Sequence, residues 1–496
     1  MSRSQPRRSS RRRLHLEALE RREVLAGNVT ASVVGSTLTL TGDGADNSLA
    51  IVALGNNRFS IAGLNTTING STAAFSPAGT ILNITGNLGG GNDNLGLTNN
   101  AQGLDTLATT AGLDLEAATG LTVAQMQARI DAVTTVRTFA LAGSLTVQGG
   151  AGNDLIGLVG NLGGSLTADL GAAGATGGNA LGIDGTTVAG GVASIGGGIN
   201  VTGGSQVDAL VVESTKVGGS ILAKLGAGNN TVDLFKAQVK GVVSVWGGNG
   251  NDFASLDSST VAGAVSLDLA GGANSVNALS STLGSWMVTT GAGNDAIDSA
   301  ALTVRTNVMV STGAGTDEIT LHEHGAAGTN VAGLLQILTG AGNKQIEVSG
   351  QIGVLSIATS SGADDVTVYD SNITSAVINT ASGNDSLTFD NVQVRAALTA
   401  LLGDGADRLD MAGFDAVSAT ILTGAGNDIL TIDDADIDVF YANLGAGNDT
   451  ATMTRSSGTV ATLDGGSGTD RLNIDNSTLA AIDHLFKLSI ETQQII

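Results

Sequence analysis

The chain contains no cysteine, only two prolines and few aromatic residues, which make up 3% of its 496 residues. Without cysteine it can form neither a disulfide framework nor a thiolate metal site. The scarcity of large rings argues against a thick globular core and favours a thin one built from small β-forming residues. Glycine, by contrast, occurs 73 times and recurs periodically in a chain that is 42% hydrophobic, so the sequence is not a disordered glycine-rich linker.

Positive charge is also scarce, because 22 Lys and Arg stand against 45 Asp and Glu and the net charge is −23. Residues 1–27 hold eight of the arginines, so this segment carries +5 and the remainder carries −28. A body this acidic is a poor partner for nucleic acid or an anionic membrane and a natural partner for cations. We therefore expect no nucleic-acid partner, and we expect no membrane span.

Residues 1–27 form a basic leader whose second half contains the run Leu16-Glu17-Ala18-Leu19-Glu20-Arg21-Arg22-Glu23-Val24-Leu25-Ala26. The leader lacks the apolar stretch of an ordinary secretory signal peptide. The run resembles the N-terminal leader of planctomycete surface and exported proteins, Leu-Glu-x-Leu-Glu-x-Arg followed by a small apolar tail, with Arg21 where proline is common. The resemblance implies export, and hence an extracellular or cell-surface location. The alternative for this segment is a disordered basic tail that binds nucleic acid.

The rest of the chain is organised around a short phrase, written most clearly in residues 424–428 as Gly-Ala-Gly-Asn-Asp and followed by alternating apolar residues. From Asp208 to Asp470 this phrase returns at intervals of mostly 21 or 22 residues. Such a unit cannot bury its own apolar face and must stack on copies of itself. Because period-two alternation dominates, the sequence predicts an all-β, right-handed parallel β-helix of about 22 residues per coil. The residues expected to stack in its core include Leu387, Leu409, Leu430 and Leu472.

The pattern divides the chain into five segments. These are a leader at 1–27, irregular N-terminal β coils or a cap at 28–100, a helical excursion at 101–140, β-helix repeats at 141–479 and a C-terminal cap at 480–496. The excursion contains a capping-box start at 122–125, and Val123, Met126, Ile130 and Val133 fall on one helical face. The last segment is more apolar and drops the corner phrase, which suits a terminal cap.

Three corners, at 149–156, 247–254 and 465–472, match Gly-Gly-x-Gly-x-Asp-x-U, where U is an apolar residue. This unit resembles the calcium-binding repeats of the RTX type, in which it recurs every nine residues and not once per coil. The resemblance implies Ca²⁺ at the corners. Electrostatics favours the same interpretation, because stacked corner carboxylates would repel one another and a hard cation would remove the repulsion. The predicted metal ligands are Asp154, Asp252, Asp295, Asp317, Asp364, Asp385, Asp407, Asp428, Asp449 and Asp470.

Turn chemistry is the alternative for the same corners. Asn and Asp tolerate left-handed backbone conformations and bond their own backbone in turns, in which case the carboxylates would splay into solvent. Asn230, Asn274 and Lys344 take the corner position in three coils and favour this alternative, since Lys344 would place an ammonium group in the row.

For catalysis the sequence offers little, and no catalytic residue is predicted. His322-Glu323-His324 lies in the longest interval between corners, where a solvated loop is favoured over a metal or acid/base role. We expect a non-enzymatic structural or adhesive protein at the cell surface, with surface polysaccharide or other cell-surface proteins as partners. The alternatives are a polysaccharide lyase or hydrolase built on the same fold, and a calcium-dependent secreted effector of the RTX type.

Overall fold

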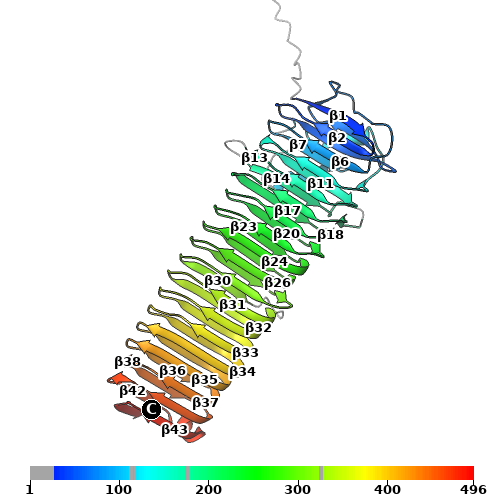
Figure 1. Ribbon diagram of the computed structural model, residues 1–496. Helices are drawn as coiled ribbons and strands as arrows, with labels where there is room; N and C mark the ends of the chain where they lie inside the picture. Colours follow the sequence, from blue (N-terminus) through cyan, green and yellow to red (C-terminus); the bar gives the residue numbers. More distant parts are fainter. Residues whose placement is uncertain are drawn as a thin grey trace, which may run out of the picture.

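The computed structural model describes residues 27–110, 116, 119, 121–173, 178–188, 190–322 and 328–496. The chain is 60% strand and 6% helix, and its strands form a parallel solenoid of about 16 turns spaced about 22 residues apart. The coils stack into a long rod whose N-terminal end is blue and whose C-terminal end is red (Figure 1). The predicted all-β parallel solenoid is confirmed. The leader predicted for 1–27 lies, except for Gly27, outside the described residues.

The strands of the first coils are short and include two antiparallel hairpins, β1 with β2 and β3 with β4. They are β1 (Asn28–Val34), β2 (Thr37–Thr41), β3 (Ser48–Gly55), β4 (Arg58–Gly63), β5 (Thr67–Ile68), β6 (Asn83–Asn87), β7 (Asn94–Thr98), β8 (Phe139–Leu141), β9 (Leu145–Gln148), β10 (Ala151–Gly152), β11 (Leu155–Leu162), β12 (Leu166–Asp169), β13 (Ala172–Ala173), β14 (Gly178–Asp184), β15 (Ala193–Ile195) and β16 (Ile199–Thr202). Because β2 pairs in parallel with β6 and β3 with β7, the segment 28–100 already belongs to the stack.

The middle coils are regular and place successive strands in parallel register. They comprise β17 (Val207–Glu213), β18 (Thr215–Val217), β19 (Ile221–Lys224), β20 (Thr231–Phe235), β21 (Gln238–Val239), β22 (Val243–Trp246), β23 (Phe253–Asp257), β24 (Thr260–Ala270), β25 (Ser275–Leu279), β26 (Thr282–Thr290), β27 (Ala296–Ala300), β28 (Thr303–Val304), β29 (Val308–Ser311), β30 (Asp317–His322) and β31 (Asn330–Leu338).

In the later coils the bends flatten, so that several strands run through almost a whole coil. These coils comprise β32 (Lys344–Ala358), β33 (Asp365–Asn379), β34 (Ser386–Asp404), β35 (Arg408–Ala425), β36 (Ile429–Asp433), β37 (Asp436–Asn443), β38 (Ala446–Gly447), β39 (Thr450–Thr454), β40 (Gly458–Asp464), β41 (Ser467–Gly468), β42 (Arg471–Ile474), β43 (Ile482–Leu488) and β44 (Thr492–Ile495).

The core is a set of apolar columns that run along the rod. Leu409 pairs with Leu387 on one side and Leu430 on the other, and all three are fully buried. Alternate residues of each strand point inward, so identical positions in successive coils stack side chain on side chain. Leu472 lies in the same column, one coil beyond Ala451. The predicted leucine stack is therefore confirmed.

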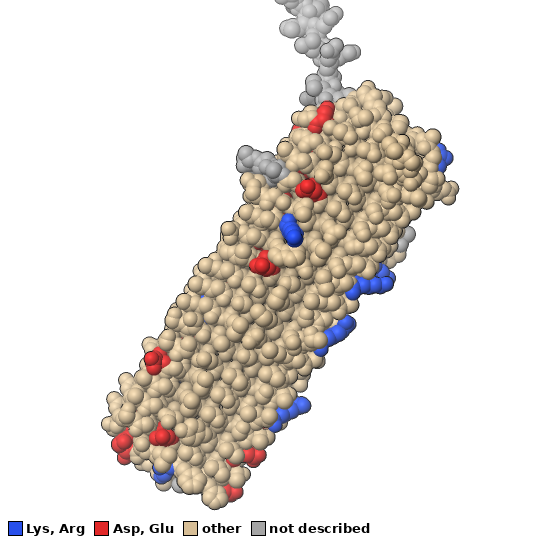
Figure 2. Space-filling view, viewed as in Figure 1, with Lys and Arg blue, Asp and Glu red and all other residues tan. Residues whose placement is uncertain are grey.

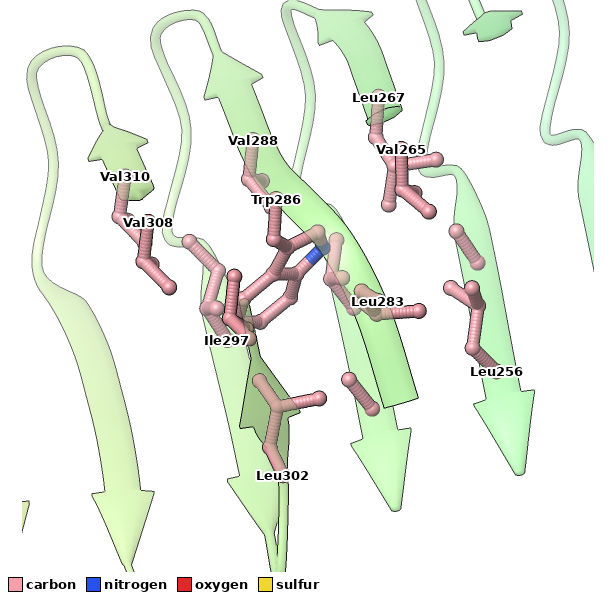
Figure 3. Close-up of a cluster of buried hydrophobic side chains, with 14 of the residues drawn as sticks. Leu256, Val265, Leu267, Leu283, Trp286, Val288, Ile297, Leu302, Val308 and Val310 are labelled. Atoms are coloured by element: carbon pink, nitrogen blue, oxygen red, sulfur yellow. The ribbon is translucent and has the colours of Figure 1, made fainter. Parts of the chain in front are cut away.

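One coil holds a much larger side chain than its neighbours. Trp286 is only 1% exposed, and its column partners in the adjacent coils are Val265 and Val308. Figure 3 shows the indole lying inside the coil, with Ile297 and Leu302 near it. The ring therefore fills the core and contributes nothing to the outer surface.

Two helices cover one side of the first coils. They are α1 (Ala101–Thr110) and α3 (Val123–Asp131), and the predicted capping box of α3 is present between Thr122 and Gln125. Leu104 of α1 packs over Gly96 and Gly157, where an added Cβ would come within 2.5 and 2.2 Å of its methyl groups. Glycine at these outward positions makes room for the helix. No helix among the described residues has both the length and the apolar character needed to cross a membrane.

The segment predicted as a C-terminal cap continues the stack. The short helix α4 (Asn476–Ala481) precedes β43, which pairs with β40, and β44 pairs with β42. The backbone N–H of Asp470 donates to Oε2 of Glu491 (2.7 Å), so a glutamate takes the place of the next corner residue. Residues 480–496 thus form the last coil of the rod.

Candidate functional site: the carboxyl column at the glycine corners

The repeated corner residues lie in one column along the rod, and each is at most 3% exposed. We call this set the corner column: Asn47, Asp93, Asp154, Asn179, Asp208, Asn230, Asp252, Asn274, Asp295, Asp317, Lys344, Asp364, Asp385, Asp407, Asp428, Asp449 and Asp470. All ten predicted metal ligands belong to it. The idea that their carboxylates splay into solvent is wrong, because the carboxylates point inward and are buried.

Each corner carboxylate binds the backbone of the coil before it. The N–H of Asp407 donates to Oδ1 of Asp428 (2.9 Å), and the N–H of Asp428 donates to Oδ1 of Asp449 (2.8 Å). Asn residues of the column do the same, since the N–H of Asp208 donates to Oδ1 of Asn230 (3.0 Å). The column is therefore a ladder of side-chain-to-backbone hydrogen bonds that joins coil to coil.

Where an Asn precedes the corner residue, it makes a second set of hydrogen bonds in the opposite direction. The N–H of Asn448 donates to Oδ1 of Asn427 (2.8 Å), and the N–H of Thr469 donates to Oδ1 of Asn448 (2.9 Å). The Asn of a Gly-Asn-Asp corner thus binds the following coil while the Asp binds the preceding one. This explains why the two residues recur as a pair, and the backbone N–H groups of the corner are satisfied on both sides.

The corner requires glycine because adjacent coils approach each other closely there and because the backbone has positive φ values. Gly426 has φ +151°, and an added Cβ would lie 1.6 Å from the carbonyl oxygen of Gly405 in the coil before. At Gly247 an added Cβ would lie 2.2 Å from Oδ2 of Asp252. The first glycine of the RTX-like Gly-Gly pair therefore makes room for the carboxylate, and the glycine two residues before the Asp lets adjacent coils touch.

Where the column residue carries a donor, that donor fills a cage of carbonyl oxygens. The amide nitrogen of Asn230 donates to the carbonyls of Gly226 (3.0 Å), Gly228 (3.2 Å) and Gly247 (2.7 Å). Two of these carbonyls belong to its own corner, four and two residues earlier. Because Asn and Asp use Oδ1 in the same way, an Asp places its second oxygen, Oδ2, where the Asn has its amide nitrogen.

Lys344 shows that a positive charge fits this place. Its ammonium is fully buried and lies 2.9 Å from Oδ2 of Asp317 in the preceding corner. It also donates to three carbonyls, those of Gly315 (2.6 Å), Ala341 (3.2 Å) and Gly313 (3.4 Å). The carboxylate and carbonyls of one Asp corner therefore hold a cation, supplied here by the next coil. The ammonium group that the sequence places in the row is therefore accommodated by the carboxylate of the preceding corner.

In other Asp corners the second oxygen has no such partner. At Asp154, Asp407, Asp449 and Asp470, Oδ2 is buried and receives no hydrogen bond from any described residue. Burial raises the pKa of Asp407 and Asp449 to about 6, and neighbouring column carboxylates push in the same direction, although a backbone hydrogen bond to each opposes the rise. A charged carboxylate at these corners is thus costly unless a proton or a cation neutralises it.

Three threonine hydroxyls lie beside corner carboxyls. The Thr423 hydroxyl lies against the Asp428 carboxyl and donates to the carbonyl of Leu444 (2.7 Å). A hydroxyl has a single hydrogen that can rotate, so Thr423 can donate either to this carbonyl or to the carboxylate, and a hydrogen bond to the carboxylate lowers the pKa of Asp428 against the larger effect of burial. The same arrangement occurs at Thr359 beside Asp364 and at Thr380 beside Asp385.

The corners also offer ligands that suit a metal cation. Ca²⁺ prefers carboxylate and carbonyl oxygens and takes six to eight of them. Each Asp corner supplies Oδ2 and backbone carbonyls, and Lys344 demonstrates that such a set accepts a positive charge. In the described part of the chain no three Asp, Glu or His side chains converge on one point. Backbone carbonyls would therefore have to provide most of the ligands at each corner.

Other candidate residues stand apart from the column. His322 is partly buried, with Nδ1 3.6 Å from Oδ1 of Asp298. Its predicted companions Glu323 and His324 lie outside the described residues. Sequence reasoning missed Asn47, Asp93 and Asn179 as column members, although the glycine-rich turn before Asp93 was a usable signal. Searches of protein-family models and of curated proteins find no match to this chain.

We expect the protein to be more stable in mild acid than at neutral pH. Burial raises the pKa of Asp93 to about 7 and that of Asp252 to about 6, above the ordinary value of 3.8. The folded state then binds more protons than the unfolded state between about pH 4 and pH 7, so stability falls as pH rises through this range. Thermal melting in Ca²⁺-free buffer at pH 5.0 and 7.5 checks this. A lower melting temperature at pH 5.0 would contradict it.

Replacing Lys344 by Met should destabilise the rod by about 3 to 5 kcal/mol, because it leaves the buried carboxylate of Asp317 and its carbonyl cage unpaired. The double variant Asp317→Asn/Lys344→Asn should recover most of this loss, since each amide can donate to its own corner as Asn230 does. Chemical unfolding at pH 7.5 measures both variants. If Lys344→Met unfolds like the parent, the ammonium does not stabilise the column.

Proposed function

We propose that the chain is a non-enzymatic, exported structural or adhesive protein of the cell surface, whose corner column is neutralised by Ca²⁺ at neutral pH. The observation that carries the proposal is the use of the repeated polar residues. In a Gly-Asn-Asp corner such as that of Asn427 and Asp428, the two side chains bind the coils on either side, so this chemistry serves to hold a long rod together. A rod that depends on local contacts between neighbours suits a spacer or scaffold outside the cell.

Two sequence features support the location and the ion. The leader resembles that of planctomycete surface and exported proteins, and the Gly-Gly corners resemble RTX-type calcium-binding repeats. Oδ2 of Asp407 with the carbonyls of Gly403 and Gly405, and Oδ2 of Asp428 with those of Gly424 and Gly426, are the groups that would hold the cation. A bound cation removes the repulsion along the column and relieves the buried charge.

Millimolar Ca²⁺ at pH 7.5 should raise the melting temperature beyond a Na⁺ control of equal ionic strength, because an ion that binds only the folded state stabilises it by mass action. At pH 5.0 the rise should shrink, since protons then occupy the carboxyls. The variant Asp407→Asn/Asp428→Asn/Asp449→Asn should bind fewer Ca²⁺ ions per chain by equilibrium dialysis and show a smaller rise.

The matched control for this experiment is Asp415→Asn/Asp436→Asn/Asp438→Asn, which removes the same charge from exposed positions in the same coils. It should keep the full Ca²⁺ response. A flat Ca²⁺ titration of the parent, with the corner variant melting higher than the parent, would leave the column as hydrogen-bond chemistry without a metal.

The proposed location is tested separately from the ion. In the source cells, an antibody against the folded rod should label intact, unpermeabilised cells or recover the chain from the medium. Protease added to intact cells should remove the cell-bound label, because a surface rod is accessible from outside. Labelling that appears only after permeabilisation would contradict export, whatever the Ca²⁺ titration shows.

A further inference from the structure

The second strand of each coil presents two outward columns along one edge of the rod. We call the first the amide column, and its members pair in register through ten successive coils: Ser194, Lys216, Gln238, Thr260, Thr282, Thr303, Asn330, Gln351, Asn372 and Gln393. Two residues further along each strand is the flanking column, consisting of Gly196, Gly218, Lys240, Ala262, Gly284, Arg305, Ala332, Gly353, Thr374 and Arg395.

These columns line hollows in the surface of the rod. A hollow of about 450 Å³ lies over residues 194–262, at the N-terminal end of the two columns, and Lys216, Gln238 and Lys240 are in its lining. A second of about 190 Å³ lies over later coils and is lined by Asn330, Gln351, Asn372 and Arg395, among others. Both hollows follow the same two columns, and we call the strip of surface formed by these columns the groove. Small flanking residues such as Gly218 and Gly353 keep the groove open.

The charge of this edge is opposite to that of the protein. Over the ten coils neither column contains an Asp or Glu, in a chain with 45 acidic residues. The two columns contain four basic residues, Lys216, Lys240, Arg305 and Arg395, and all four are exposed. None of them forms an ion pair with another described residue. Figure 2 shows several Lys and Arg side chains spaced along one long edge of the rod. The groove is thus a weakly positive strip on an acidic body.

The strip ends abruptly at its C-terminal side. The amide column continues as Asp415 and Asp436, and the flanking column reaches Asp438 in the same direction. A third hollow of about 450 Å³ contains these carboxylates together with Arg395. An anionic ligand would be repelled there, so this change of sign marks one end of the site.

We infer that this groove binds a linear anionic polysaccharide, one that carries carboxylate or sulfate groups at intervals along a hydroxyl-rich chain. The inference rests on the proposed adhesive function and names its ligand. Asn and Gln side chains supply both donors and acceptors, as sugar hydroxyls require. Asn372 already donates to Oε1 of Gln393 (3.3 Å), which shows that amides of successive coils come within bonding distance. A repeat along the axis matches a polymer better than a compact ligand.

The spacing of the cations separates this ligand from nucleic acid. The ten coils span about 40 Å at ~4.8 Å per coil, and only four cations lie along them. Duplex DNA carries a negative charge about every 1.7 Å of its axis, and single strands need aromatic residues for base stacking. Neither column contains an aromatic residue. At physiological salt, screening acts over about 8 Å, so a ligand in the groove responds mainly to the nearby cations.

The test compares the full chain with a groove variant, Lys216→Gln/Lys240→Gln/Arg305→Gln/Arg395→Gln. Glutamine keeps the polar character of the amide column and removes its charge. The control variant Lys224→Gln/Arg408→Gln/Arg455→Gln/Arg471→Gln makes the same change of charge at positions outside the two columns. Thermal melting of the groove variant within a few degrees of the parent shows that the fold is kept. The probes are polygalacturonate, dextran sulfate, neutral dextran, a single-stranded DNA oligonucleotide and anionic phospholipid vesicles.

We expect polygalacturonate or dextran sulfate to bind the parent and the control equally and the groove variant about tenfold more weakly, because four exposed charge contacts are lost. Binding that is equal in all three proteins would overturn the groove while leaving an adhesive function in place. Binding only of DNA or vesicles, or of no probe at all, would overturn the inference as well. Shortening of the polymer by the parent alone would support the groove and overturn the non-enzymatic proposal.

Discussion

The structure depends on hydrogen bonds between a corner side chain and the backbone of the adjacent coil. At a glycine corner the chain leaves the strand direction, and parallel strand pairing cannot satisfy every N–H group there. The Asp of the corner accepts from the coil before and the Asn accepts from the coil after. Most coils make the first of these bonds and several add the second, so the bonds join the coils in the same register as the leucine column beneath them.

Burying so many carboxyl groups in one column costs electrostatic free energy, and the column reduces this cost in three ways. Asn230 and Asn274 replace the second oxygen by an amide that donates to the same carbonyls. Lys344 extends an ammonium group into the preceding Asp corner. The remaining aspartates keep a buried carboxyl whose neutral form, or whose bound cation, is favoured over a bare charge. The Asn and Lys residues of the column therefore solve the same problem as the aspartates, which is the cost of a buried negative charge.

Much of the fold could be predicted from the sequence, because in a solenoid the length of the sequence repeat equals the number of residues per coil. The spacing of Asp407, Asp428 and Asp449 predicts the coil length, and the alternation around Leu430 predicts which side chains are buried. The column was harder to interpret, since the sequence cannot show which carboxylate oxygen faces the backbone. From the sequence alone, the ammonium of Lys344 counts against a cation in the row, because the reach of this side chain to Asp317 in the preceding coil is visible only in three dimensions.

The groove was missed for a different reason. Its residues form no motif, since Gln238, Thr260 and Asn330 share only their hydrogen-bonding capacity and lack of negative charge. The signal is the absence of acidic residues, and it becomes visible only when the sequence is aligned by coil. The two outward columns contain no Asp or Glu in ten successive coils, and the next residue of the amide column is Asp415. Selection of side chains on the inner face is limited by packing, whereas the outer face of a strand is free to vary. Packing of the fold does not dictate a long uncharged and basic strip on so acidic a rod, and a ligand along that edge would account for it.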